Sequence, residues 1–533
     1  MNPPIPTHAA NPRAVIVIGA GIAGLSAALS LAERGVSPLV LEADPHFAGG
    51  RVAGGPVAEF EHQGEMWQFR GEHGIHGFWS QYHNLRAVLK RNTILPHFNS
   101  AIEEEWILAR HGHITRAAAG SAIRDSFFPA PFHYAMMFLR PRFWTMLGLR
   151  DWLSIPLVLG RLLGALSIDP LREGKSLRGL TLEDFCRGWS PSLRAFFAGL
   201  ARSGLSAHPE EVPLDGFIAF LRFYTLLRRD SWRFDYLTAD SGIALIEPML
   251  TRLQALGGEV ILGAQVTQIQ REDEPAGWRV RFDFDGNPIY TRARRLILAT
   301  DAPAAQRILR HSPDTAPQAE PLIFPTGLST AVVRLWFNTA PRFGPEAGIF
   351  TGDFILDNFF WLHRFQTDFA LWHAATGGSA LEAHVYGPPA VIDQLDAVLL
   401  AQMITDVYRA WPELRGQLAH QVLRRNPAAH TLFKIGASED RLATHTPWPG
   451  ITACGDWVRH PTPALFLERA CVTGIDAANA VLEALGKSAW PLVPHTKPEL
   501  LAGLMEKALR GSRHLLRALA KRKSVDTGKR GLH

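Results

Sequence analysis

The chain has 533 residues, of which 47% are hydrophobic and 20% are charged, so it has room for more than one domain and the composition of a globular protein. Its net charge of +5 is concentrated at one end, because residues 497–533 contain ten Lys or Arg and three Asp or Glu. The basic residues form a tail rather than stripes through the sequence, and zinc-finger spacing and RNA-recognition motifs are missing, which excludes a nucleic-acid partner.

The cysteines and the apolar segments constrain the compartment. Cys186, Cys454 and Cys471 are widely spaced, so the sequence supports neither a disulfide framework nor a metal site. Residues 1–13 lack the charged-then-apolar order of a signal peptide, and no uncharged apolar stretch approaches the roughly 18 residues that a membrane span requires. We therefore expect a cytoplasmic protein that does not cross a membrane.

The first regular element is the β-branched run Ala14–Ile18, which predicts a buried parallel strand. It leads into Gly19-Ala20-Gly21-Ile22-Ala23-Gly24, which has GxGxxG spacing, and the small residues that follow predict a helix ending before Gly35. Pro38–Leu41 predicts a second strand, which ends at Glu42. A strand, a glycine turn, a helix and a second strand ending in an acid are typical of a dinucleotide-binding domain.

Each residue of this turn has a physical role. Gly19 permits the tight turn, Gly21 lets a pyrophosphate approach the backbone, and Gly24 lets the helix pack closely on the strand. The helix N-terminus, where Ala23 lies, supplies N–H groups and a positive dipole to phosphates. Glu42 can accept hydrogen bonds from an adenosine ribose. We predict that these residues bind a dinucleotide.

Further segments, spread over nearly the whole chain, carry related signals. They are a second glycine turn at Gly49-Gly50-Arg51, a strand over Gln265–Ile269, a strand over Arg295–Pro303, and a closing strand over Gly450–Trp457 that is followed by a helix over 468–485. In this order they resemble the motifs of the FAD-dependent amine oxidase and carotenoid desaturase superfamily. The resemblance implies an α/β fold, with a Rossmann-type FAD-binding domain, a mixed β-sheet substrate domain and a helical insert.

The resemblance also assigns roles to individual residues. It implies non-covalent FAD, with the Gly49-Gly50-Arg51 segment beneath the pyrophosphate and Asp456, after Gly455, at the ribityl chain or pyrophosphate. Gly474 matches the glycine within the closing helix. Val266 matches a position whose main chain contacts the adenine, although a plain hairpin strand explains this residue equally well.

One segment indicates the branch of the superfamily. The residues from Glu72 to Leu85, with His76 between glycines and aromatic residues, resemble phytoene and zeta-carotene desaturases and, more closely, isorenieratene synthase. The stretches 357–364 and 382–387 fit the same group. His76 is the candidate catalytic residue, positioning substrate or flavin, and the alternative is a histidine packed in a loop. Glu468 and Arg469 are either catalytic or a surface ion pair, and we favour the ion pair.

The motifs divide the chain into six parts. They are the FAD-binding domain in three pieces (1–99, 236–300 and the closing motif 446–487), a helical insert facing substrate and membrane (100–235), a substrate domain (301–445) and a basic tail helix (488–533). The tail is expected to place Leu501, Leu504, Met505, Ala508, Leu515, Leu516 and Leu519 on one face, and Arg510, Arg513, Arg517 and Lys521 on the opposite face. In the insert, Phe143, Trp144, Leu147, Leu149, Trp152 and Leu153 lie beside Arg140, Arg142 and Arg150. Both patterns predict peripheral attachment to a membrane surface.

The resemblance implies hydride transfer from a long apolar isoprenoid to FAD. The expected substrate is a carotenoid, and the reaction is desaturation or, as in isorenieratene synthase, aromatisation of a β-ring. A hydrocarbon has no acidic proton to remove, so we expect no charged catalytic dyad. The alternatives are oxidation of a soluble amine and a non-catalytic prenyl-lipid-binding protein. The redox acceptor, whether oxygen, quinone or nicotinamide, has no signature in the sequence.

Overall fold

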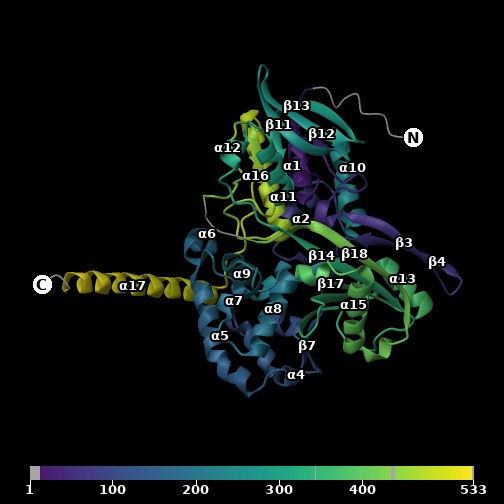
Figure 1. Cartoon of the computed structure of the whole chain (residues 1–533), viewed down its shortest axis with the longest axis vertical. Helices are drawn as coiled ribbons and strands as arrows, with labels where there is room; N and C mark the ends of the chain where they lie inside the picture. The colour runs from purple at the N-terminus through teal and green to yellow at the C-terminus, as the bar shows by residue number, and fades with distance from the viewer. Residues whose placement is uncertain (1–11, 343, 434–438, 531–533) are drawn as a thin grey trace.

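The computed structural model describes residues 12–342, 344–433 and 439–530, without the side chains of 174–175 and 516–530. Its described part contains two seven-stranded sheets and a helical body (Figure 1). The first sheet lies at the top of the view, the second at the lower right, and the helical body at the lower left. Helix α17 (Leu500–Arg530) extends away from the helical body.

The first sheet is built around the predicted N-terminal strand. β1 (Arg13–Ile18) pairs in parallel with β2 and β13, and β19 pairs in parallel with β13. In spatial order the sheet runs β10 (Glu259–Ile261), β2 (Leu39–Leu41), β1, β13 (Asn287–Leu298), β12 (Ala276–Phe284) and β11 (Gln265–Asp273). β19 (Ile451–Ala453) pairs with β13 outside this order. The strands predicted at 14–18, 38–41, 265–269, 295–303 and 450–457 all belong to this sheet, and the predicted α/β class is confirmed.

Alternate residues of β1 contribute to two different cores. Val15 and Val17 pack with helices α1 (Ile22–Ala32), α16 (Phe466–Ala484) and α10 (Glu247–Ala255). Ile16 and Ile18 pack on the other side, with strands β11 and β12 and helix α11 (Ala302–His311). The sheet is thus buried on both faces, as a parallel sheet requires.

The second sheet is mixed, and five of its seven strands come from the predicted substrate domain. Within it β15 pairs in parallel with β7, whereas its other pairings are antiparallel. Its strands, in spatial order, are β18 (Leu418–Thr431), β14 (Gly327–Phe337), β17 (Ser379–Val385), β16 (Asn358–Trp361), β15 (Ala347–Gly352), β7 (Glu104–Arg110) and β8 (His113–Ala118). Helix α15 (Asp396–Ala410) packs Leu399, Met403 and Val407 into its core.

The predicted helical insert is not entirely helical. Its first residues form β7 and β8 of the second sheet, because residues 104–109 pair in parallel with the edge of β15. The rest consists of helices, and the principal ones are α5 (Leu149–Ser167), α8 (Pro191–Leu205) and α9 (Leu214–Leu221). Two small sheets join the layers: β3 (Gly54–His62) with β4 (Glu65–Glu72), and β5 (Phe78–Trp79) with β9 (Phe234–Leu237) and β6 (Phe98–Ser100).

The remaining described helices are mostly short. They are α2 (His83–Arg91), α3 (Gly120–Arg124), α4 (Pro141–Trp144), α6 (Pro170–Glu173), α7 (Leu182–Phe185), α12 (Ala316–Ala319), α13 (Thr367–Thr376) and α14 (Pro389–Ile392).

Helix α17 docks on the helical body through its first turns, so the predicted basic face is wrong for these turns. Arg513 pairs with Glu173, and Arg510 pairs with Glu506, which also receives a bond from Arg222. Leu504 and Leu515 are exposed instead. Ion pairing within the protein therefore fixes which face is turned outward. The side chains of Leu516, Arg517, Leu519 and Lys521 lie outside the described residues.

Gly474 provides a test of the helix packing over the first sheet. A Cβ atom at Gly474 of α16 would lie 2.3 Å from the carbonyl oxygen of Ala23 in α1, so we expect Gly474→Ala to force the helices apart. Overpacking of this kind costs about 1–3 kcal/mol, measured as a loss in the free energy of unfolding or in Tm. Gly160→Ala is the matched control, because Gly160 lies in α5 with nothing within 4 Å of its would-be Cβ atom. Equal Tm values for the two variants would contradict the packing argument.

Candidate active site

A cavity of about 1010 Å³ lies at the edge of the first sheet where β1, β2, β13 and β19 end. In open α/β sheets, ligands bind at the carboxyl ends of the parallel strands. Nine of the twelve residues predicted to bind the cofactor line this cavity: Gly19, Gly21, Ala23, Glu42, Gly49, Gly50, Arg51, Val266 and Asp456. The other three, Gly24, Gly455 and Gly474, are not in its wall. The structure thus brings together motifs from both ends of the chain.

The first glycine turn brings backbone atoms closer than a side chain would allow. Gly19 has φ +105°, and a Cβ atom there would lie 2.8 Å from the carbonyl oxygen of Ala299. A Cβ atom on Gly24 would lie 2.0 Å from the carbonyl oxygen of Gly19. Ala23, in the first turn of α1, is in the cavity wall, so the N–H groups and dipole of the helix favour an anion there. This cradle fits the pyrophosphate of FAD.

Glu42 is fixed by main-chain N–H groups where β2 ends. Its two carboxylate oxygens accept hydrogen bonds from Ala20 N at 2.7 Å and Asp44 N at 3.0 Å. Burial raises the pKa of Glu42, and these N–H donors oppose that shift. A carboxylate has about four acceptor positions, so this one can accept ribose hydroxyl groups as well.

Arg51 and Asp456 meet across the fold. Arg51 Nη2 donates to Asp456 Oδ2 at 2.5 Å, and Thr431 Oγ1 donates to Asp456 Oδ1 at 2.9 Å. The two partners are 405 positions apart in the sequence. Both line the cavity, so the pair joins the second glycine turn to the closing motif at the site that the resemblance assigns to the pyrophosphate and ribityl chain.

Gly455, which is not in the wall, has a structural reason for being glycine. It has φ +145°, and a Cβ atom there would lie 2.9 Å from Trp457 Nε1. Its N–H donates to Thr473 Oγ1 of α16 at 2.9 Å. This bond ties the end of β19 to the closing helix and so positions Asp456.

The loop over residues 73–77 brings His76 into the cavity wall. Burial, together with the charge of Arg51 and the nearby His384, lowers the pKa of His76 to about 4, so it is neutral at pH 7. Ile75 N donates to Glu382 Oε1 at 2.8 Å, and a Cβ atom on Gly74 would lie 3.0 Å from His384 Cε1. The loop is therefore packed against β17, and a role for His76 in positioning ligands remains a prediction.

The expected surface ion pair between Glu468 and Arg469 is wrong. Both side chains are buried, at 0% and 3% exposure, and they bind different partners. Glu468 accepts bonds from Asn84 N and Nδ2 at 2.8 Å and from Leu85 N at 3.0 Å, which satisfies the N-terminus of α2. Arg469 donates to the carbonyl oxygens of Val458 and of Thr462, each at 2.8 Å. Both residues hold chain segments in place beside the cavity.

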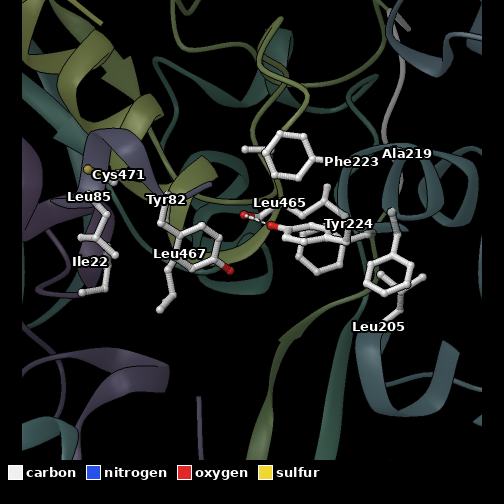
Figure 2. Close-up of a cluster of buried hydrophobic side chains, with 14 of the residues drawn as sticks. Ile22, Tyr82, Leu85, Leu205, Ala219, Phe223, Tyr224, Leu465, Leu467 and Cys471 are labelled. Carbon is white, nitrogen blue, oxygen red and sulfur yellow. Dashed lines mark hydrogen bonds between the residues drawn. The ribbon is translucent and has the colours of Figure 1, made fainter. Parts of the chain in front are cut away.

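Large apolar side chains of the insert, the small sheets, the second sheet and the start of α16 line the rest of the cavity. They include Trp79, Tyr82, Leu200, Phe220, Trp232, Phe234, Tyr236, Ile349, Phe360, Phe466 and Leu467. Figure 2 shows Ile22 of α1, Tyr82 and Leu467, which all line this cavity, in one cluster with Tyr224, whose Oη donates to the carbonyl oxygen of Leu465 at 3.2 Å. The apolar wall is thus continuous with the turns expected to hold FAD.

The stretch 382–387 was singled out only for its resemblance, and the chain of hydrogen-bonded polar residues that it forms at this wall was not predicted. Glu382, His384 and Tyr386 alternate along β17 and its end, so they share one face of the strand. His384 Nε2 lies 2.8 Å from Glu382 Oε1, and its Nδ1 lies 2.6 Å from Tyr386 Oη. Asn358 Nδ2 donates to Tyr386 Oη at 3.3 Å. The period-two spacing of an acid, a histidine and a tyrosine in an apolar strand was the available signal.

Comparison with known sequences identifies the family. The sequence model of the family described as flavin containing amine oxidoreductase matches residues 22–482. Carotenoid phi-ring synthase of Streptomyces griseus is 30% identical over 485 residues, covering 89% of this chain and 88% of that protein. Carotenoid phi-ring synthase of Chlorobaculum tepidum is 21% identical, with 91% of each chain covered. A 15-cis-phytoene desaturase of Glycine max is 23% identical over 61% of this chain and 54% of its own length.

Solved structures show the same fold. Cyclohexylamine oxidase from Brevibacterium oxydans superposes with a TM-score of 0.65 over 90% of this chain and 100% of its own, at 15% identity. Putrescine oxidase superposes with a TM-score of 0.61 over 90% and 100%, at 14% identity. These identities indicate a shared fold and nothing finer, whereas the family model spans most of the chain. The chain therefore belongs to the flavin containing amine oxidoreductase family and is an FAD-dependent oxidoreductase.

Proposed function

We propose that this enzyme oxidises a carotenoid and that it converts a β-ring end group into an aromatic ring. The observation that carries the proposal is the match to carotenoid phi-ring synthase over nearly the full length of both chains. The desaturase matches cover about half of those enzymes and support only the broader carotenoid class. Oxidation of a soluble amine is the competing function, and the assay below separates the two.

The cavity supports an apolar substrate. FAD, when bound, supplies an acceptor for a hydride from carbon, and the protein supplies binding, orientation and exclusion of water. Aromatic rings from three parts of the chain, such as Trp79, Trp232 and Phe360, line the same cavity as the glycine turns. A hydrocarbon ring, which has no polar groups to pair, can therefore lie beside the cofactor site in contact with apolar side chains.

We assign the FAD-binding role to the nine lining residues named above, with Glu42 at the ribose and Asp456 at the ribityl chain or pyrophosphate. The cofactor is expected to be non-covalent, as the resemblance implies, and a thioether link is disfavoured because the buried Cys186, Cys454 and Cys471 lie outside the described cavity wall.

Substitution of either carboxylate tests the cofactor assignment. We expect Glu42→Ala and Asp456→Ala each to lower FAD occupancy and affinity, because an unpaired buried hydroxyl costs about 1–3 kcal/mol. The measurement is the flavin absorbance per protein of the purified variants, followed by titration of the apoprotein with FAD. Glu247→Ala on the exposed pair with Arg70 is the control and should retain full flavin. Full occupancy and unchanged affinity in both cavity variants would show that the assignment is wrong.

The substrate class is tested by reduction of the flavin without oxygen. We expect carotenoids with β-rings, delivered in liposomes, to bleach the flavin absorbance, and simple polyamines or amino acids to leave it unchanged. A cyclohexene ring must lose four hydrogens to become aromatic, and each reduction of FAD accounts for two of them. With an electron acceptor added for repeated turnovers, the product should therefore be lighter by four hydrogens per ring in mass spectrometry. Rapid reduction by amines with none by carotenoids would establish the competing function.

We also propose that the protein attaches to a membrane surface through α5 and its surroundings. Among the described residues, no helix is both long enough and apolar enough to cross a bilayer. Leu149, Leu153 and Leu157, spaced by four on α5, are exposed by 77%, 73% and 43%. The expected membrane-facing set is only partly exposed. Phe143 and Leu147 are buried in the core, and the rings of Trp152 and Trp144 pack together with their centroids 4.7 Å apart.

The surroundings of this leucine face fit an anionic lipid surface. Arg140, Arg142 and Arg150 are exposed next to it in the sequence, and each basic residue near such a surface contributes about 1 kcal/mol. Helix α5 packs against α8, and Leu200 of α8 lines the cavity. The exposed leucines are thus one helix layer away from the cavity that an apolar substrate must reach.

The leucine face is tested by co-sedimentation with anionic liposomes. We expect replacement of Leu149, Leu153 and Leu157 by Ser to lower the partition coefficient for the liposomes at least about tenfold. The reason is that burial of each leucine side chain contributes about 1.5–3 kcal/mol. The matched control replaces Leu371, Leu395 and Val398, exposed by 60%, 78% and 44% around α13 and α15, which lie on the other side of the molecule in Figure 1. Equal loss in both triple variants, or no loss in either, would contradict attachment through α5.

A further inference from the structure

The polar chain in the cavity wall has a defined proton arrangement. Burial opposes the charge of Glu382, but Arg334 and the hydrogen bond from His384 lower the pKa of Glu382 to about 2, so it is a carboxylate. Its Oε2 accepts from Arg334 Nε at 2.6 Å, and its Oε1 accepts from Ile75 N at 2.8 Å. A carboxylate can only accept hydrogen bonds, so the proton on the shared contact belongs to His384 Nε2.

The tautomer of His384 then fixes the direction of the next bond. Arg334 pairs with Glu382 at 2.6 Å and balances its charge, so this carboxylate has a cation partner without His384. With the proton on Nε2, Nδ1 is an acceptor, so the hydroxyl of Tyr386 donates to it. Asn358 Nδ2 donates to the Tyr386 oxygen from the other side. The Ser206 hydroxyl also interacts with the Tyr386 oxygen, so this oxygen receives bonds only from neutral donors while its own proton already points at a base.

We propose that Tyr386 and His384 together accept the proton that the substrate loses when a new ring double bond forms. This inference rests on the proposed function, in which hydride loss from a ring carbon leaves a ring cation. A C–H bond next to the cationic carbon breaks, and its electron pair forms the C=C bond. The proton goes to the Tyr386 oxygen as the phenolic proton passes to His384 Nδ1. Glu382 and Arg334 act as positioning residues.

The other titratable groups of the described wall are less suited to this task. Burial and the charge of Arg51 disfavour a proton on His76. Glu104 is already bound to Arg124 at 2.9 Å and to Trp232 Nε1 at 3.3 Å. Among the described histidines of the wall, His384 alone has a carboxylate partner in the structure, which stabilises the imidazolium once it forms. A C–H bond next to a carbocation is strongly acidic, so the Tyr386 hydroxyl backed by His384 is a sufficient base.

The charged and titratable groups around His384 set the pH range of any test. They are Glu382 and Tyr386 on its own strand, Asp357 before β16, Arg334 on β14 and His76 in the loop over 73–77. Asp357 is itself paired with Arg202 at 2.9 Å and accepts from Tyr386 N at 2.6 Å. Burial raises the pKa of the Tyr386 hydroxyl well above its usual value, so tyrosinate does not form near neutral pH.

The arrangement itself is tested on the FAD-loaded protein without substrate. With ¹⁵N-labelled histidine, NMR should show one ring in the Nε2–H form with a strongly hydrogen-bonded proton, assigned to His384 by its loss in His384→Gln. The signal should shift in Glu382→Gln and in Tyr386→Phe and stay in place in Tyr408→Phe, which removes a hydroxyl outside the described wall. A proton on Nδ1, or on both nitrogens at pH 7, would overturn the proposed relay.

The chemical role is tested in a single turnover with a β-ring carotenoid in liposomes. Flavin bleaching reports hydride loss, and the product spectrum reports formation of the first new ring double bond. In Tyr386→Phe and His384→Gln we expect bleaching within about threefold of the wild type and product formation slowed by about 10²-fold, the usual contribution of a general base. Tyr408→Phe should match the wild type in both.

The remaining outcomes are also decisive. If both signals slow together and the flavin content falls, the residues are structural and the proposal is wrong. If neither signal changes, the proton leaves by another route and the proposal is wrong. If the wild type itself is not reduced by carotenoids, the proposed function fails, and the relay proposed here fails with it, whereas the NMR result still decides whether the hydrogen-bond arrangement exists.

Discussion

Close approach of backbone to backbone at the glycine turn is the constraint on which the site depends. Gly24 lies against the carbonyl oxygen of Gly19, and Gly474 of α16 lies against that of Ala23 in α1. These contacts hold two helix N-termini, from opposite ends of the chain, at one edge of the first sheet. Side chains at these positions would separate the helices. Without that packing, the loops that carry Glu42 and Asp456 would not line one cavity.

Charge balance is the second constraint, because the apolar cavity lies directly beside buried ions. Arg334 pairs with Glu382, and Arg202 pairs with Asp357, and all four side chains are at most 10% exposed. A buried charge without a partner costs several kcal/mol, whereas a paired and hydrogen-bonded one is tolerated. The four ionic side chains lie outside the described wall, whereas Asn358, His384 and Tyr386 present polar groups to the cavity.

The sequence was sufficient wherever the signal is local. The turn from Gly19 to Gly24 and the strands beside it depend on residues within thirty positions, and the structure has these elements where they were predicted. It was insufficient where a partner lies far along the chain. Glu468 was assigned to the surface because its donors, Asn84 N and Leu85 N, come from a helix 384 and 383 positions away.

The predictions for the outward face of α17 and for the start of the insert were wrong for the same reason. The period of the tail is helical, as expected, but Glu173 and Glu506 decide which side Arg510 and Arg513 face. In the insert, residues 104–110 become a strand because β15, more than two hundred positions later, offers a parallel edge. Periodicity gives the type of element, and only the tertiary partners give its orientation.

The expectation that no charged dyad is needed follows from the inertness of a hydrocarbon, and it holds only until the first hydride leaves. The cation that remains is acidic at the neighbouring carbon, and in an apolar cavity the proton must pass to the protein. A carboxylate in direct contact with such a cation would bond to it and trap it as an ester. In this structure Glu382 is absent from the described wall and acts through His384 on the hydroxyl of Tyr386. That separation lets a base serve a carbocation without reacting with it, which explains why an acid, a histidine and a tyrosine alternate on a strand that is otherwise apolar.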